Sequence, residues 1–330
     1  MAALLGVPPL VVGLTVVAWG TGAPELAVTV QASLAAQTDI AVGNVVGSNI
    51  CNVLLILGLS AVVSPLVVSR QLVRRDVPVM IGVSVLVLLL ALDGMLSRVD
   101  GLLLVALFAA YTALALWKGR PSAGSTETRR AANAAGAART GGRQWIVLIG
   151  FILVGLALLV LGSRWLVDGA VAIAKSLGMS ELIIGLTVVA VGTSMPEIAT
   201  SVLAGIRGRS DIAVGNAVGS NIFNLLAALG VASIVSAEGI PVPEDTLVFN
   251  LPVMLVVALA CLPIFFTGYR VARWEGALFL LYYAAFTTFL VLDALEHEAL
   301  PVYSSALVIF ALPVTGVTLL TLVVRAARGK

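Results

Sequence analysis

A stretch of 48 residues occurs twice in this chain, and this repeat constrains the fold more than any other feature. Residues 13–60 return as residues 185–232, shifted by 172 positions without a gap, and 28 of the 48 positions are identical. The polar residues agree better than the apolar ones. Apolar positions of a membrane helix can drift, so polar residues kept in both copies indicate that one chemistry is present twice.

The composition excludes a water-soluble fold. The chain is 60% hydrophobic and only 11% charged, with a mean hydropathy of +1.11, whereas a soluble domain must cover itself with polar side chains. The net charge of +2 is too small to indicate a nucleic-acid partner. Cys51 and Cys261 each lie inside an apolar run, which is typical of small core residues rather than of a disulfide or metal pair. The sequence therefore predicts an all-α, polytopic protein of the lipid bilayer.

Apolar runs of roughly 17 to 25 residues are long enough to cross the hydrocarbon core of a bilayer as helices. Ten such runs occur, at 9–35, 40–63, 77–93, 100–117, 145–174, 181–206, 212–236, 247–267, 274–292 and 302–325. The polar segment 118–144 is rich in Gly, Ala, Ser and Arg, which is typical of a flexible linker. We expect a first repeat at 1–117, a second at 145–292, and an extra C-terminal transmembrane helix at 302–325.

Positive charge orients these spans, because Lys and Arg of short loops stay on the cytoplasmic side of a membrane. If the linker is inside, alternation of the spans places 16 of the 19 basic residues inside. They are Lys118, Arg120, Arg129, Arg130, Arg139 and Arg143 of the linker, with Arg70, Arg74, Arg75, Arg207, Arg209, Arg270, Arg273, Arg325, Arg328 and Lys330. This predicts a multi-pass protein of the cell's inner (cytoplasmic) membrane, with the linker and the C-terminus in the cytoplasm.

The two copies are predicted to cross the membrane in opposite directions. Five spans separate the start of the first copy from the start of the second, and an odd number reverses the direction. Inverted repeats with interrupted helices are the usual construction of secondary transporters, whose substrate site lies near the bilayer midplane.

The first polar motif interrupts a helix in each copy. Residues 20–25 read GTGAPE and residues 192–197 read GTSMPE. Proline removes a backbone donor, which frees carbonyl groups just before Glu25 and Glu197. An ionised carboxylate at this depth costs roughly 2.5–3.5 kcal/mol unless it is paired, and neither hairpin has a Lys or Arg at comparable depth. A bound cation would supply the missing charge; the alternative is a protonated carboxyl that is hydrogen-bonded to a neighbour.

The second polar motif supplies neutral oxygens. It reads GNVVGSNICN at 43–52 and GNAVGSNIFN at 215–224. Ser48 and Asn52 are four residues apart and share a helix face, as do Ser220 and Asn224. The two glycines of each copy allow a second helix to approach closely. Carboxylate, amide, hydroxyl and carbonyl oxygens together suit hard cations such as Ca²⁺ and Na⁺, whereas Zn²⁺ and Cu prefer thiolate or imidazole.

Together the two motifs resemble the alpha repeats of the Ca²⁺:cation antiporter superfamily, in its bacterial sodium/calcium exchanger-like branch. The resemblance covers nearly the whole chain and implies two inverted repeats with broken helices at the ion site. It also implies Ca²⁺ and Na⁺ as transported ions, and no cofactor. By resemblance, Glu25, Glu197, Asn52 and Asn224 form the central site, and flanking Na⁺ sites are lined by Thr21, Thr193, Ser194, Ser48, Ser220 and the carbonyls of Ala18 and Ala190.

Three features depart from the family pattern. Gly22 stands where the family often has serine, which removes one hydroxyl from a flanking site. Asn224 stands where some members have aspartate, so the site holds two carboxylates rather than three. The first copy lacks the helix that precedes the second copy at 145–174; we expect either an upstream start codon or a compensating role for the helix at 302–325.

Three classes of transport remain open at this point. Na⁺/Ca²⁺ antiport by alternating access is the leading hypothesis, and exchange of Ca²⁺ or another cation for H⁺ at the same glutamates is the alternative. A passive cation channel is the third class. An intramembrane enzyme is disfavoured, because the single histidine, His297, lies in a loop and neither cysteine has a candidate base nearby.

Other polar residues of these stretches have structural interpretations. Asp39 and Asp211 begin helices and are predicted to be N-caps. Arg74, Arg75 and Asp76 are expected to form a solvated cytoplasmic cluster. Ion ligation and interhelical hydrogen bonding both remain open for Asn44, Asn49, Asn216 and Asn221.

Overall fold

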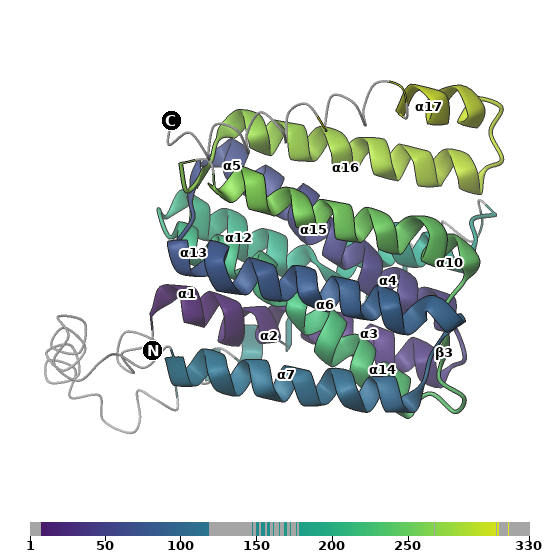
Figure 1. Ribbon diagram of the computed structural model, residues 1–330, viewed down its shortest axis with the longest axis horizontal. Helices are drawn as coiled ribbons and strands as arrows, with labels where there is room; N and C mark the ends of the chain where they lie inside the picture. The colour runs from purple at the N-terminus through teal and green to yellow at the C-terminus, as the bar shows by residue number, and fades with distance from the viewer. Residues whose placement is uncertain are drawn as a thin grey trace, which may run out of the picture.

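The computed structural model describes residues 8–118, 178–266 and 268–307, together with single positions between 147 and 177 and residues 309 and 316. Helices make up most of these residues; several of the long ones lie along one common direction, and others cross them obliquely (Figure 1). Within the described residues, six helices are long and apolar enough to cross a membrane, or up to eight if each of two bent pairs is one span. The all-α, polytopic prediction is confirmed.

The first half begins with a bent helix pair. Its first arm consists of α1 (Pro9–Val12), η1 (Gly13–Val17) and α2 (Ala18–Thr21), and its second arm is α3 (Ala23–Leu34), bent by 44°. The next helix joins α4 (Thr38–Cys51), η2 (Asn52–Leu57) and α5 (Gly58–Val63). After β1 (Leu66–Val67) come η3 (Leu72–Asp76), α6 (Val77–Leu90), η4 (Ala91–Asp93), β2 (Met95–Leu96) and α7 (Arg98–Lys118).

The second half repeats this order of elements. Its bent pair consists of α10 (Glu181–Ile184), η5 (Gly185–Val189) and α11 (Ala190–Thr193), followed by α12 (Met195–Ile206) at 46°. The next helix joins α13 (Ser210–Phe223), η6 (Asn224–Ala228) and α14 (Leu229–Val235). After β3 (Ile240–Pro241) come η7 (Thr246–Asn250), α15 (Leu251–Phe266), β4 (Arg270–Val271), α16 (Arg273–Ala294) and α17 (Leu300–Ala306).

Eight of the ten predicted spans match these helices and bent pairs. The spans predicted at 145–174 and 302–325 lie largely outside the described residues, as does the linker at 118–144. The helix predicted at 77–93 begins five residues earlier, at Leu72, because a helix end tolerates arginines that extend into water.

Two short antiparallel strand pairs join the halves. In one pair Leu66 of β1 lies opposite Val271 of β4, and in the other Leu96 of β2 lies opposite Ile240 of β3. These four side chains are buried. Since α6 runs from the β1 end of the bundle to the β2 end, whereas α15 runs from the β3 end to the β4 end, the two corresponding helices are antiparallel (Figure 1). Opposite directions of corresponding helices are what an inverted repeat requires.

The halves also interlock at the centre of the bundle. Helix α4 packs against α10, η5 and α11 of the second half, and α13 packs against α1, η1 and α2 of the first. A β-carbon at Gly47 would overlap the carbonyl oxygen of Leu186, and one at Gly219 would lie 2.7 Å from that of Leu14. The predicted close approach of helices at the glycines is therefore confirmed.

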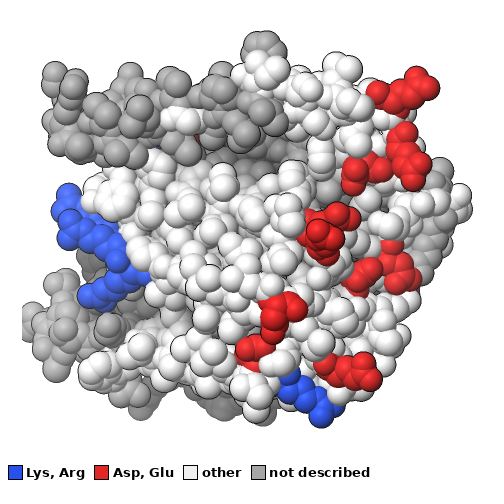
Figure 2. Space-filling view, turned by 45° about the vertical axis from the view of Figure 1, so that its right-hand side comes forward, with Lys and Arg blue, Asp and Glu red and all other residues white. Residues whose placement is uncertain are grey.

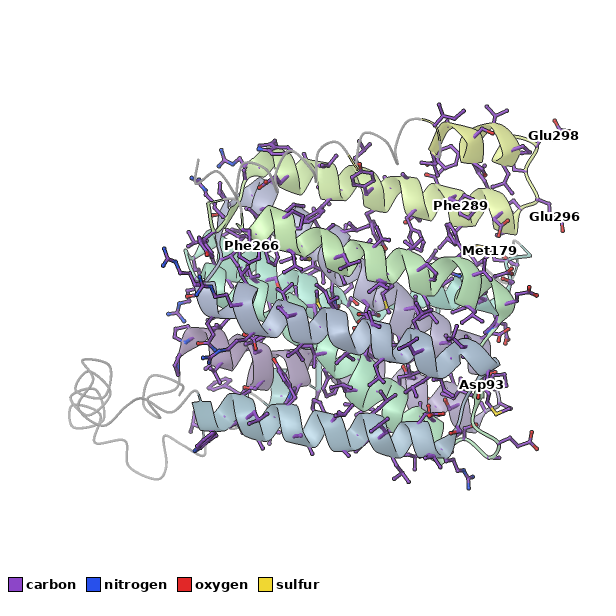
Figure 3. The ribbon with its side chains drawn as sticks, in the orientation of Figure 1. Asp93, Met179, Phe266, Phe289, Glu296 and Glu298 are labelled. Carbon is purple, nitrogen blue, oxygen red and sulfur yellow. The ribbon has the colours of Figure 1, made fainter. Side chains whose placement is uncertain are left out.

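Charge separates the two ends of the bundle. Basic groups gather at one end and acidic groups at the other (Figure 2). Asp93, Glu296 and Glu298 lie at the acidic end, opposite Phe266 (Figure 3). Arg98 is an exception, because it follows β2 at the acidic end, where its Nε donates to the carbonyl of Ser236 at 2.9 Å.

Three aspartates differ from their predicted roles. Helix α4 begins at Thr38 and α13 at Ser210, so Asp39 and Asp211 lie in the first helical turn and not at the N-cap. Their charge still suits the positive end of the helix dipole. The prediction of a solvated Asp76 is also wrong, because this residue is 7% exposed and its Oδ1 accepts a hydrogen bond from the hydroxyl of Tyr111 at 3.3 Å.

Candidate functional site

Each bent helix pair breaks directly before its glutamate. Gly22, with φ −76° and ψ 0°, separates the arms in the first half, and Ser194, with φ −81° and ψ 5°, separates them in the second. The second arm of each pair has a proline in its first turn, where the missing N–H does no harm. Glu25 and Glu197 follow in the same turn, so the positive end of each helix dipole lies at a carboxylate.

The two glutamates are buried without a neutralising base. Both are 0% exposed, and every Lys or Arg whose side chain the structure describes is exposed. Glu25 Oε1 accepts a hydrogen bond from the Ser194 hydroxyl at 3.0 Å, and Glu197 Oε1 accepts one from Ser220 at 3.4 Å. Within the described part of the chain, Oε2 of each glutamate has no hydrogen-bond partner.

Asn52 and Asn224 add one unpaired oxygen each. Each asparagine is the first residue of a π-helical turn, η2 or η6, a feature that is frequent at functional sites. Nδ2 of Asn52 donates to Asn221 Oδ1 at 2.9 Å, and Nδ2 of Asn224 donates to Asn49 Oδ1 at 3.3 Å. Oδ1 of Asn52 and of Asn224 is buried and has no partner among the described residues.

The four unpaired oxygens come from neighbouring residues of both halves. Glu25 accepts a hydrogen bond from Ser194, which lies three residues before Glu197 in the other half. Glu197 accepts one from Ser220, the neighbour of Asn221, which in turn holds Asn52. A buried polar group without a partner costs roughly 1–3 kcal/mol, and more if it is charged. Four such oxygens in one place therefore indicate that a ligand completes the site.

The donor set fits a hard cation. Two carboxylates and two amide oxygens resemble the oxygen ligands that Ca²⁺ takes in proteins. The described residues contain no group of three or more His, Cys, Asp or Glu that could hold a metal. Neutral oxygens must therefore complete the shell, which disfavours a zinc-type site.

Neutral oxygens lie on both sides of these four groups. The first oxygen cluster surrounds Glu25 and comprises Thr193, Ser194, Ser48 and the Ala190 carbonyl, to which Ser48 donates at 3.4 Å. The second oxygen cluster lies beside Glu197 and comprises Thr21 and Ser220, with the Ala18 carbonyl one helical turn before Gly22, whose N–H it accepts at 2.9 Å. The structure thus brings together the side chains that the sequence singled out, and the Ala190 carbonyl with them.

Asparagines of the opposite half lie within hydrogen-bond distance of the two threonines, whose hydroxyls also reach the carbonyls of Val189 and Val17 at 3.0 Å. Thr193 Oγ1 lies 3.1 Å from Asn44 Oδ1, and Thr21 Oγ1 lies 3.2 Å from Asn216 Oδ1. Nδ2 of Asn44 in turn donates to Thr29 Oγ1 at 2.9 Å. Ion ligation and interhelical hydrogen bonding were both open for these asparagines. Asn44 and Asn216 make interhelical hydrogen bonds, and so do Asn49 and Asn221.

Two residues at the site were missed by the sequence analysis. Met254 Sδ accepts a hydrogen bond from Asn49 Nδ2 at 3.6 Å, and Met80 Sδ accepts one from Asn221 Nδ2 at 3.4 Å. Both methionines lie outside the repeated stretch, in helices whose apolar composition gives a methionine no distinguishing signal. Only the tripeptide Pro-Val-Met, present at 78–80 and at 252–254, pointed to them.

Comparison with known proteins places these features in a family. The family model described as sodium/calcium exchanger protein matches residues 1–117 and 147–292. The chain is 33% identical over 316 residues to the sodium/calcium exchanger MaX1 of Methanosarcina acetivorans, covering 87% of this chain and 90% of that protein. It is 39% identical over 265 residues to the inner membrane protein YrbG of Escherichia coli, covering 78% and 79%.

A solved structure agrees with the fold. A structure of the sodium-calcium exchanger NCX_Mj, soaked with Na⁺ and Sr²⁺, matches this chain with a TM-score of 0.69 at 30% sequence identity. The match covers 86% of this chain and 87% of that one. The chain is therefore a membrane protein that belongs to the sodium/calcium exchanger protein family.

Proposed function

We propose that this chain is a Na⁺/Ca²⁺ antiporter that binds its ions at Glu25, Glu197, Asn52 and Asn224. The observation that supports this most strongly is the set of four buried oxygens, one from each of these residues, that find no hydrogen-bond partner in the described part of the chain. Two ionised carboxylates balance the charge of one Ca²⁺. The amide oxygens add ligands without adding charge, so the ion can also leave.

Competition for the same carboxylates would couple the two ions. Glu25 also belongs to the first oxygen cluster and Glu197 to the second, so Na⁺ in either cluster shares a ligand with Ca²⁺ at the centre. A site that holds either Ca²⁺ or Na⁺, and opens to one side at a time, exchanges one for the other. The helix breaks at Gly22 and Ser194 are the hinges at which the two arms of each bent pair can move.

We place the basic end of the bundle in the cytoplasm. Arg70, Arg74, Arg75, Arg270 and Arg273 are exposed and lie near the β1–β4 pair, whereas exposed acidic residues predominate near β2–β3 (Figure 2). The positive-inside rule then puts the linker at 118–144 and the C-terminus in the cytoplasm of the inner membrane. In this proposal residues 1–117 and 145–292 are the two repeats, and 302–325 is an additional span.

Exchange for H⁺ is the main alternative to exchange for Na⁺. A proton needs only the two carboxylates, whereas Na⁺ needs neutral oxygens around them. The hydroxyls of Thr21, Thr193, Ser48, Ser194 and Ser220, all buried near the carboxylates, favour Na⁺ for this reason.

The test is Ca²⁺ uptake into Na⁺-loaded proteoliposomes with the internal and external pH clamped at one value by an ionophore. We expect uptake that requires the outward Na⁺ gradient and stops when external Na⁺ equals internal Na⁺. Uptake that follows an imposed pH gradient instead would establish H⁺ exchange. Uptake that needs neither gradient would establish a channel.

A further inference from the structure

The amides of Asn52 and Asn224 serve a cation only if their oxygen ends face it. The two ends of a side-chain amide are alike in shape, but one accepts hydrogen bonds and the other donates two. An amide turned by a half rotation would place N–H groups against the ion. Packing alone cannot prevent this, so the hydrogen-bond partners of the amide must.

Each of these amides is held by an asparagine of the other half. Asn52 Nδ2 donates to Oδ1 of Asn221 at 2.9 Å, and Asn224 Nδ2 donates to Oδ1 of Asn49 at 3.3 Å. This arrangement leaves the Oδ1 of Asn52 and of Asn224 unpaired. It holds only while Asn221 and Asn49 keep their own oxygens turned toward the site.

Asn49 and Asn221 turn their NH₂ groups toward atoms that can only accept. Nδ2 of Asn221 donates to the Asn49 carbonyl at 3.3 Å and to Met80 Sδ at 3.4 Å. Nδ2 of Asn49 donates to the Asn221 carbonyl at 3.5 Å and to Met254 Sδ at 3.6 Å. A carbonyl oxygen and a thioether sulfur have no proton to give, so a turned amide would set oxygen against oxygen and oxygen against sulfur.

We propose that Met80 and Met254 are positioning residues that fix the polarity of the ion-binding amides. The amide relay runs from Met80 through Asn221 to Asn52, and from Met254 through Asn49 to Asn224. Met80 is 0% and Met254 2% exposed, so water cannot replace the sulfur as acceptor. The inference rests on the proposed function only in taking the four unpaired oxygens as a cation site.

The pairing of the two methionines supports a polar role. They lie on α6 and α15, at matching places in the two halves, and each approaches an asparagine of α13 or α4. Leucine has nearly the same volume as methionine and would fill the same space. What leucine lacks is the acceptor, so packing by itself does not account for a sulfur at both places.

The experiment replaces the acceptor while keeping the volume. The variants are Met80→Leu/Met254→Leu, which removes both sulfurs, and Met80→Gln/Met254→Gln, which restores an oxygen acceptor. Met95→Leu is the matched control, because Met95 is 41% exposed in β2 and has no part in the relay. Two measurements are made on each protein. The first is the rise in melting temperature on titration with Ca²⁺, Na⁺ or Mg²⁺. The second is Ca²⁺ exchange, which gives the Ca²⁺ concentration for half-maximal rate and the maximal rate.

We expect the double leucine variant to need about five times more Ca²⁺ for half-saturation, the effect of roughly one lost hydrogen bond. Its melting temperature without cation and its maximal rate should stay near those of the wild type, and the double glutamine variant should recover most of the affinity. Unchanged affinity in the leucine variant overturns the relay. Equal loss in the leucine and glutamine variants also overturns it, because packing would then be the cause.

The titrations separate this inference from the proposed function. If Ca²⁺ fails to stabilise the wild type but Na⁺ or Mg²⁺ succeeds, the proposed exchange is wrong, and the relay still predicts weaker stabilisation of the leucine variant by that cation. If no cation stabilises the wild type, the four oxygens are not a cation site and both proposals fall.

Discussion

A β-carbon added to Gly22 would lie 2.8 Å from Cδ1 of Phe223 and 2.8 Å from the carbonyl oxygen of Ala18, so the phenylalanine ring and the preceding helical turn together fill the space of a side chain. The backbone does not require glycine, because Ser194 has nearly the same φ and ψ at the corresponding place. Cys51 corresponds to Phe223 in the repeat and lies beside Ser194. Glycine therefore stands beside a large residue in one pair, Gly22 with Phe223, whereas two small residues stand together in the other pair, Ser194 with Cys51.

This difference between the two pairs predicts the effect of restoring the missing hydroxyl. Gly22→Ser alone should lower the melting temperature, because overpacking typically costs about 1–3 kcal/mol. Gly22→Ser/Phe223→Cys copies the Ser194–Cys51 pair into the second oxygen cluster. It should recover part of the melting temperature, because the contact with the Ala18 carbonyl remains. It should also make the dependence of Ca²⁺ exchange on Na⁺ steeper, as an added Na⁺ ligand requires. A single Gly22→Ser variant that is as stable as the wild type would contradict the packing argument.

The interlocked helices predict a strong effect at another glycine. Gly47→Ala should prevent α4 from approaching η5, because the new methyl group meets the backbone carbonyl of Leu186 and a backbone cannot turn aside. We expect little folded protein by size-exclusion chromatography. Gly82→Ala on α6 is the control, because no atom of the described residues lies within 4 Å of the added carbon. This variant should be neutral or stabilising by up to about 1 kcal/mol. Equal yields of the two variants would show that the close approach is not needed.

Much of this site could be predicted from the sequence, because the polar residues that form the site occur in both copies of the repeat. Glu25 and Glu197 were found from a carboxylate beside a proline in an apolar run, and Gly47 from its four-residue spacing. Met80 and Met254 were missed, because their role depends on which atom faces an asparagine of another helix. The cap prediction for Asp39 failed by two residues at a helix start, a distance that the local sequence does not resolve.

The buried Asp76 gives a further prediction. Tyr111→Phe removes the hydroxyl that donates to Asp76 Oδ1 and should lower stability by roughly 1–3 kcal/mol, measured as a lower melting temperature. The double variant Tyr111→Phe/Asp76→Asn should lose less stability than Tyr111→Phe alone, because burying a neutral amide costs less than burying a carboxylate. The second half already has an asparagine, Asn250 of η7, at the corresponding position.

The control for this pair is Tyr269→Phe, which keeps the aromatic ring under the guanidinium of Arg70, 5.2 Å from its centroid. The melting temperature of this variant should equal that of the wild type. If Tyr111→Phe also leaves the melting temperature unchanged, the hydrogen bond to Asp76 contributes nothing to stability.

The two buried glutamates and two asparagines are proposed to hold the transported cation. The most direct test is Ca²⁺ binding to purified protein, measured by calorimetric titration of the wild type, Glu25→Gln, Glu197→Gln and the control Asp211→Asn. Each glutamine keeps the shape of the side chain and removes one charge, so Ca²⁺ affinity should fall at least about 100-fold, since the number of charged ligands sets calcium affinity. Asp211→Asn, in the first turn of α13, should bind Ca²⁺ like the wild type. Wild-type affinity in both folded glutamine variants would rule out Glu25 and Glu197 as ligands of the cation.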